Sequence, residues 1–377
     1  MNVEGFINTV KSIHGKNEVP LHAPFFRGNE IDYLKETIQS SFVSSVGKYV
    51  NKLESSICKF TGSEFAIATN TGTSALHTSL ILAGVKKNNE VLTQALSFVA
   101  TSNAISYVGA TPVFVDVDYD TMGMSPNALE EFLEEFGEIR ENGTFNKKSG
   151  KIISACLPMH TFGFVCRINE IRSICKKWNI SLVEDAAEAL GSKRSNKSAG
   201  TFGDISALSF NGNKIITSGG GGMILTQNKN KAIEAKHLTT TAKVNHEWEY
   251  FHDRIGFNYR MPNLNAALAF AQLEKFENIL SSKKSLYNDY VNELKSSNFN
   301  LIEIPCNTKW NYWLFSVSLD NKTDRDTFLR ETNKMGVSTR PIWKLLFRLP
   351  MFNNCQRDSQ KNAKELESKI VNIPSNI

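Results

Sequence analysis

Apolar runs of strand length alternate with helical patterns over the first two thirds of the chain. The strand-like runs are residues 65–70 (FAIATN), 90–96 (EVLTQAL), 112–118 (PVFVDVD), 151–160 (KIISACLPMH) and 180–185 (ISLVED). These runs are continuously apolar rather than alternating. They therefore predict a largely parallel sheet that is covered by helices on both faces.

The remaining patterns complete an α/β fold. Two more strand-like runs, 205–210 (ISALSF) and 222–226 (GMILT), follow the first five, and the polar stretch 137–150 is expected to form a surface loop. Ser125 and Pro126 have the residue types of a helix cap and a first-turn proline, so a helix is expected directly after them.

The pattern changes near Pro262, where two long helices are followed by a strand pair, a further helix and a coil-rich tail. We therefore expect two units. A large domain with a mostly parallel sheet would span residues 1–260, and a smaller C-terminal α/β domain would span residues 261–377.

Composition narrows the class of protein. Of the 377 residues, 41% are hydrophobic and 21% are charged, which is ordinary for a soluble globular enzyme. The net charge of +5 comes without a clustered Lys/Arg stripe, so a nucleic-acid partner is not expected. The six cysteines form no CxxC pair, which argues against a metal site and a disulfide framework. No apolar stretch reaches about 18 residues, so we expect no membrane partner and a cytoplasmic protein.

Two ionisable residues stand at the mouths of probable buried strands. Asp185 ends one apolar run, and Lys214 follows another, with Ser209 before it and glycines after it. An acid and a lysine in such positions suggest pyridoxal phosphate chemistry. In that chemistry the lysine binds the cofactor as a Schiff base, and the acid pairs with the pyridinium nitrogen.

Each of these two residues also has a plainer interpretation. Lys214 is one of 43 basic residues, most of which are expected to be solvated surface charges. Asp185 could cap a helix over AAEAL, or could be the metal-binding acid of a P-loop NTPase. The chain has no GxxxxGK[ST] loop, which excludes the NTPase.

The chain resembles the DegT/DnrJ/EryC1/StrS family of PLP-dependent sugar aminotransferases. The resemblance runs from FVSSVGKYV through NTGTSALH, LSFVATSNAI and SFNGNKIITSGGGG to GFNYRMPNLNAALAFAQLE and TRPIWKLL. It implies PLP fold type I and a homodimer with shared active sites. L-glutamate would be the amino donor and a nucleotide sugar the acceptor. The form SFNGNKIITSGGGG is similar to the branch that aminates nucleotide-linked 4-keto-6-deoxy-N-acetyl sugars toward bacillosamine or legionaminic acid.

The resemblance implies roles for a set of cofactor-binding residues. The turn at Gly72 and Thr73 would cradle the cofactor phosphate, and Phe98 would stack on the pyridine ring. Each has an alternative, an ordinary tight turn for the first and core packing for the second. Glu188 departs from the Gln that is usual in the family. The full set is Gly72, Thr73, Phe98, Asp185, Glu188, Ser209, Lys214 and Asn258.

Asn258 is implied to contact the phosphate in the partner's site, because the segment 237–263 crosses the dimer interface in the family. The alternative is a self-contained surface loop. His160 follows a strand, where it could line the pocket or be structural. The candidates for the substrate diphosphate are Lys243, Arg260 and Arg340.

Two rival functions are considered. A sugar 3-dehydratase of this family carries His in place of the Schiff-base lysine, and Lys214 argues against it. A PLP-binding regulatory relative would be signalled by loss of Lys214 or Asp185, and both are present. The sequence does not separate UDP from GDP in the substrate.

Overall fold

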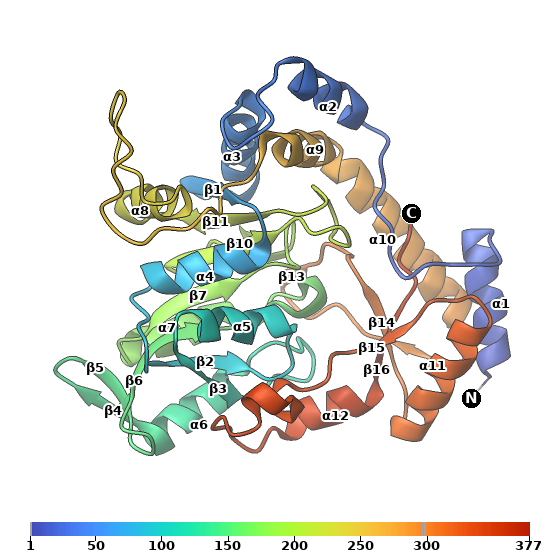
Figure 1. Ribbon diagram of the computed structural model, residues 1–377. Helices are drawn as coiled ribbons and strands as arrows, with labels where there is room; N and C mark the ends of the chain where they lie inside the picture. Colours follow the sequence, from blue (N-terminus) through green and yellow to red (C-terminus); the bar gives the residue numbers. More distant parts are fainter. Residues whose placement is uncertain (1, 296, 298) are drawn as a thin grey trace.

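The computed structural model describes residues 2–295, 297 and 299–377, and its larger part is built around one mixed sheet (Figure 1). The strands in spatial order are β1 (Phe65–Thr69), β11 (Gly222–Thr226), β10 (Ile205–Ser209), β7 (Ser181–Asp185), β6 (Ile152–Leu157), β2 (Glu90–Gln94) and β3 (Thr111–Val115). The five strands from β10 to β3 are parallel, and β11 is antiparallel to both neighbours. The predicted mostly parallel sheet is therefore confirmed.

Helices cover both faces of this sheet and create two hydrophobic cores. Residues alternate along each strand, so that Val183 of β7 joins one core and Leu182 joins the other. The helices on one face are α4 (Gly72–Leu82), α5 (Val99–Tyr107) and α8 (Lys229–Thr239), and those on the other are α3 (Lys48–Thr61), α6 (Pro126–Phe136) and α7 (Ile168–Lys177). The predicted start of α6 is confirmed, because Ser125 Oγ accepts a hydrogen bond from Ala128 N.

The stretch 137–150, expected to be a surface loop, is a β-hairpin. Its strands are β4 (Gly137–Arg140) and β5 (Gly143–Asn146), and β5 continues the sheet by pairing antiparallel with β6. Thr144 and Asn146 are fully buried, and Asn146 Nδ2 donates to Glu90 Oε2 of β2 at 2.7 Å. The Asn142–Gly143 dipeptide, which is typical of tight hairpin turns, is the sequence signal for this element.

The C-terminal part contains a second, antiparallel sheet. Its strands in spatial order are β12 (Asn300–Leu301), β14 (Phe315–Ser318), β16 (Ile370–Ile373) and β15 (Arg340–Pro341). The chain around this sheet carries α10 (Phe276–Leu294), α11 (Lys322–Lys334), α12 (Lys361–Lys369) and the short 3₁₀ turns η2 (Leu346–Arg348) and η3 (Pro350–Phe352).

The two helices expected after Pro262 are present but have different neighbours. The first, α9 (Asn263–Glu274), packs on α3 and on α2 (Glu30–Gln39), whereas α10 packs against α1 (Val3–His14). The N-terminal helix thus joins the C-terminal part, as Figure 1 shows. The division into domains at residue 260 stays a prediction.

A third, three-stranded sheet links the two parts of the molecule. It pairs β13 (Thr308–Lys309) with β8 (Lys193–Arg194), and β8 with β9 (Lys197–Ser198). A single 3₁₀ turn, η1 (Thr161–Gly163), follows β6.

Among the described residues, no helix is both long enough and apolar enough to cross a bilayer.

Candidate functional site

A cavity of about 660 Å³ lies where the carboxyl ends of the parallel strands face the C-terminal sheet. Ligands of open α/β sheets bind at this edge. Of the predicted site residues, those that line the cavity are Gly72, Thr73, Phe98, Asp185, Glu188, Ser209, Lys214 and Arg340. Positions more than 260 residues apart along the chain are thus brought together.

Asp185 is the last residue of β7, and its carboxylate is buried in the cavity wall with 2% of the residue exposed. Its Oδ2 accepts a hydrogen bond from Thr101 Oγ1 at 2.8 Å, and its Oδ1 accepts one from Ala187 N at 3.2 Å. Burial raises the pKa of this carboxyl, against the effect of the two hydrogen bonds. No helix follows directly, so the helix-cap alternative for Asp185 is wrong.

Lys214 lies in the turn after β10 with its amine directed at a carboxylate. Its Nζ is 3.0 Å from Glu188 Oε1 and 4.2 Å from the ring centre of Trp313. Only 12% of the lysine side chain is exposed, which excludes a solvated surface charge. Glu188 also accepts a hydrogen bond from Phe162 N at 2.9 Å, and burial raises the pKa of its carboxyl while the Lys214 charge opposes that shift.

The N-terminus of α4 forms the opposite end of the cavity. Thr71 caps the helix, because its Oγ1 accepts a hydrogen bond from Ser74 N at 3.0 Å. The N–H groups of Gly72 and Thr73 begin the helix and have no acceptor one turn earlier, which is the arrangement that binds anions. A Cβ at Gly72 would lie 2.9 Å from Ser209 Cβ, so only glycine permits this close approach.

Phe98 immediately precedes α5 and lies in the cavity wall. It is 51% exposed, so it is not a core residue. Its ring lies 6.5 Å from that of Trp343, which lines the same cavity. An exposed flat face beside a cavity is suited to stacking on a planar ligand.

These groups together fit pyridoxal phosphate. Asp185 offers a buried anion that needs a cationic partner, as a pyridinium nitrogen would be. The start of α4 with Ser209 offers donors to a phosphate, Lys214 offers an amine, and Phe98 offers an aromatic face.

Three predicted substrate residues lie outside the cavity. His160 is fully buried, with Nε2 3.0 Å from Glu184 Oε2, so its structural alternative holds. The guanidinium of Arg260 already has partners within the fold: it donates to Glu54 Oε1 at 2.9 Å and to the Ala68 carbonyl at 3.0 Å. Lys243 lies over the ring of Tyr250 at 4.0 Å, in a surface segment. The sequence identified these residues as candidates, but it did not show which carboxylate, carbonyl or aromatic ring each of them contacts in the fold.

Asn258 does not line the cavity of its own chain. Its backbone pairs with Thr240, and its carbonyl accepts a hydrogen bond from Asn70 Nδ2 at 3.3 Å. The segment 240–258 projects from the body beyond α8 (Figure 1). It exposes large side chains such as Trp248 and Tyr250. The role of Asn258 in a partner's site stays a prediction.

The C-terminal part contributes cavity residues that the sequence analysis did not single out. They are Trp313, Trp343 and Lys344, which complete the wall facing Asp185 and Lys214. Two of the five tryptophans of the chain thus line one cavity. The rarity of tryptophan was the available signal, but periodicity alone does not place a C-terminal loop against a distant sheet.

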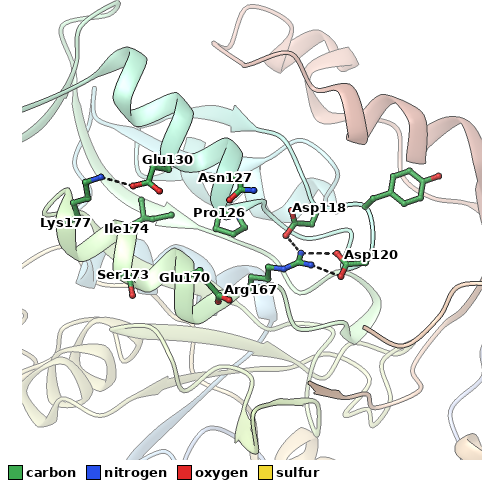
Figure 2. A pocket seen from close by; sticks show the side chains of 11 residues that line it. Asp118, Asp120, Pro126, Asn127, Glu130, Arg167, Glu170, Ser173, Ile174 and Lys177 are labelled. Atoms are coloured by element: carbon green, nitrogen blue, oxygen red, sulfur yellow. Dashed lines mark hydrogen bonds and ion pairs between the residues drawn. The ribbon is translucent and has the colours of Figure 1, made fainter. Parts of the chain in front are cut away.

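A larger groove of about 940 Å³ lies between α6 and α7, and both cationic side chains that line it are held in ion pairs (Figure 2). Arg167 bridges Asp118 and Asp120, with 2.9 Å between its Nη2 and Asp120 Oδ2. Lys177 Nζ lies 2.7 Å from Glu130 Oε1. Size alone therefore does not mark the functional site.

Comparisons with known proteins agree with this geometry. The DegT/DnrJ/EryC1/StrS aminotransferase family matches residues 25–377. GDP-perosamine synthase of Escherichia coli O157:H7 is 32% identical over 360 residues, covering 95% of this chain and 93% of the relative. EpsN of Bacillus subtilis, named as a pyridoxal phosphate-dependent aminotransferase, is 34% identical over 95% of this chain and 91% of its own.

A solved structure shows the same fold at lower identity. Helicobacter pylori PseC, an aminotransferase involved in the biosynthesis of pseudoaminic acid, is 24% identical and superposes with a TM-score of 0.85, covering 95% of this chain and 93% of its own. The fold type I expected from the sequence is confirmed. The chain therefore belongs to the DegT/DnrJ/EryC1/StrS aminotransferase family, a family of pyridoxal phosphate-dependent sugar aminotransferases.

Proposed function

We propose that this enzyme transfers an amino group from L-glutamate to a nucleotide-linked 4-keto-6-deoxy-N-acetylhexosamine, for an amino sugar of a bacterial surface glycan. One observation carries the amino-transfer chemistry. The buried Asp185 carboxylate, the Lys214 amine and the N-terminus of α4 converge on one cavity. The choice of sugar rests on SFNGNKIITSGGGG, whereas the relatives named GDP-perosamine synthase support a nucleotide-linked amino sugar in general.

Bound pyridoxal phosphate supplies a conjugated ring that takes up the electron pair left when a proton leaves the donor's α-carbon. Asp185 holds a proton on the ring nitrogen, because a buried carboxylate favours a positive partner. Lys214 would accept and return the proton that leaves the donor's α-carbon. Gly72, Thr73 and Ser209 would hold the cofactor phosphate.

Glu188 orients the lysine for this work. Its Oε1 holds Lys214 Nζ at 3.0 Å, and its Oε2 is anchored by Phe162 N at 2.9 Å. Because both oxygens are engaged and the side chain is only 2% exposed, the carboxylate has little freedom to turn away. The amine therefore stays in the cavity rather than extending into solvent.

We infer that the enzyme works as a homodimer in which Asn258 reaches the phosphate site of the partner. The projecting segment and its exposed aromatic side chains support this arrangement. Lys214→Ala and Asn258→Glu, each inactive alone, should complement when subunits exchange. In the mixed dimer one site collects both defects and the other collects neither. A mixture that stays inactive despite demonstrated exchange would place Asn258 in its own chain's site.

The substrate is tested by incubating the purified enzyme with glutamate and a panel of nucleotide sugars. The panel contains UDP- and GDP-linked 4-keto-6-deoxy sugars, each with and without the N-acetyl group. We expect amination of the N-acetylated sugars, detected by mass and by NMR at C4. Exclusive turnover of a sugar without the acetamido group would contradict the proposed substrate.

A further inference from the structure

The amine of Lys214 lies between two side chains in the cavity that also contains Asp185, the cofactor cavity. Glu188 Oε1 is 3.0 Å from Lys214 Nζ, and the ring centre of Trp313 is 4.2 Å from the same atom. The face of an indole attracts an ammonium group, and the attraction is stronger where water is excluded. The amine therefore has two favourable neighbours, a carboxylate and an aromatic face.

Trp313 has little freedom to turn away from the lysine. It is 2% exposed, and its Nε1 donates a hydrogen bond to the carbonyl of Asn213 at 2.7 Å. Asn213 directly precedes Lys214 in the chain, so the indole is attached to the backbone beside the residue that its ring faces. The ring cannot move away from the amine without losing this hydrogen bond.

The side chain of Asn311 connects the two neighbours of the lysine. Asn311 is fully buried, and its Nδ2 donates to the carbonyl of Glu188 at 2.8 Å and to that of Leu190 at 3.0 Å. Its Oδ1 accepts a hydrogen bond from Trp313 N at 3.1 Å. The backbone of the acid and the backbone of the aromatic residue are therefore held by one amide group.

The turn η1 supports the same arrangement. Phe162 donates its N–H to Glu188 Oε2 at 2.9 Å. Gly163, the next residue, has φ +90°, and a Cβ there would lie 2.2 Å from Asn311 Oδ1. A larger residue at this position would displace the amide, so the turn requires glycine where it contacts Asn311.

We propose that Trp313 is a positioning residue for Lys214, and that its indole and the Glu188 carboxylate form a resting place for the lysine amine. The amine needs such a place because it leaves the cofactor when the donor binds and has to return to it. This inference rests on the proposed role of Lys214 as the lysine that binds the cofactor. It gives the C-terminal part of the chain, which contains Trp313, a direct effect on the position of the amine.

The first test compares Trp313→Leu and Trp313→Phe with the wild-type holoenzyme in the reaction with glutamate alone, followed by cofactor absorbance. Phenylalanine keeps an aromatic face and loses the hydrogen bond to Asn213, which should lower the limiting rate about threefold. Leucine also loses the face, which should add a factor of about ten. The glutamate concentration that gives half of the limiting rate should stay within about twofold of the wild-type value, because the contact acts on the lysine and not on the substrate.

A second measurement reports on the amine itself and needs no turnover. Glutamate is added to each holoenzyme until the cofactor absorbance stops changing, and is then removed, which leaves Lys214 unbonded. Acetic anhydride labelling with peptide mapping then gives the rate at which the amine is modified. Lys214 should be labelled about fivefold faster in Trp313→Leu, because its amine has lost the aromatic side of its resting place.

Trp178→Phe is the matched control, because it also removes an indole. Trp178 follows α7, is partly buried and does not line the cofactor cavity. Both rates should equal those of the wild type. Trp313→Met is a second variant without an aromatic face, with a flexible side chain that adapts to the space. Thermal unfolding verifies that each variant folds, and equal effects in the control would overturn the positioning role.

The outcomes separate this inference from the proposed function. Wild-type labelling of Lys214 in the folded leucine or methionine variant would overturn the resting place. Weaker binding of glutamate at an unchanged limiting rate would make Trp313 a substrate-binding residue instead. Borohydride fixation in the wild type tests Lys214 independently. Cofactor fixed on another lysine would overturn the proposed role of Lys214, whereas cofactor on Lys214 with unchanged labelling would overturn only the role of Trp313.

Discussion

Lys214 and Lys283 are both largely withdrawn from solvent, but only Lys214 lies in a functional site. Lys214 is 12% exposed in its side chain, faces the Glu188 carboxylate at 3.0 Å and opens onto the cofactor cavity. Lys283 lies on α10 with 1% of the residue exposed, and its Nζ donates to the Ser375 carbonyl at 2.6 Å. Burial lowers the pKa of Lys283 from 10.5 to about 7.

The comparison shows that burial is not what makes a lysine catalytic. Burial favours the neutral, nucleophilic form of an amine, and it is more complete at Lys283, which does not line the cofactor cavity. Its role is structural, because Ser375 also donates its N–H to Leu21 O at 2.8 Å and accepts from Phe315 N at 2.9 Å. Lys214 differs because a buried acid (Asp185), the N-terminus of α4 and the aromatic face of Phe98 line the same cavity as its amine.

The largest expected difference between the two lysines is in turnover. Lys214→Ala should lower kcat by about a thousandfold or more, because it removes both the nucleophile and the proton-transferring group. Lys283→Met should keep kcat within a small factor. Borohydride reduction followed by peptide mapping should place the cofactor on the peptide that contains Lys214. Label on another lysine would refute the assignment.

A second substitution tests Asp185, the buried acid that distinguishes the surroundings of Lys214 from those of Lys283. Asp185→Asn should lower kcat by at least about a hundredfold, because a neutral amide does not hold the ring-nitrogen proton, and lost electrostatic stabilisation has costs of this size. The free energy of unfolding should change little, since the amide can still accept from Thr101. Near-normal turnover in this variant would leave Asp185 without a catalytic role.

The sequence predicted much of this site because its parts lie at the ends of regular elements. The strands that end near Asp185 and Ser209, and the helix that begins at Gly72, follow from local apolar patterns. The contacts of the remaining residues depend on tertiary packing, which the local pattern does not show. The pattern of α10 places Lys283 on its apolar face, at helical spacing from Ile279 and Leu286. It does not show that the distant Ser375 carbonyl accepts a hydrogen bond from the amine.

A smaller effect is expected at Glu188, which holds Lys214 in place. Glu188→Gln should lower kcat about tenfold, the cost of weakening a hydrogen bond to a charged group. The glutamine can still accept from Phe162 N, so thermal stability should be retained. Glu188→Ala removes both contacts and should lower kcat and stability together. Equal loss of stability in both variants would make Glu188 a structural residue rather than a positioning one.

The smallest effect concerns the pH dependence of stability, and it belongs to Lys283. Its pKa of about 7 in the folded protein lies below the ordinary 10.5. Between these values the unfolded chain binds a proton that the folded chain does not, so the free energy of unfolding rises with pH. The free energy of unfolding of the wild type minus that of Lys283→Met should therefore increase by roughly 2 kcal/mol from pH 7 to pH 9.

Urea unfolding of both proteins at several pH values measures this difference. The contributions of the titratable groups that both proteins contain cancel in it. Lys284→Met is the matched control, since Lys284 is the exposed neighbour on the same helix and should show no such growth. A difference that stays flat for Lys283→Met would mean that Lys283 remains protonated inside the fold. The contrast with Lys214 would then rest on the cavity and on the carboxylate of Glu188 beside the Lys214 amine.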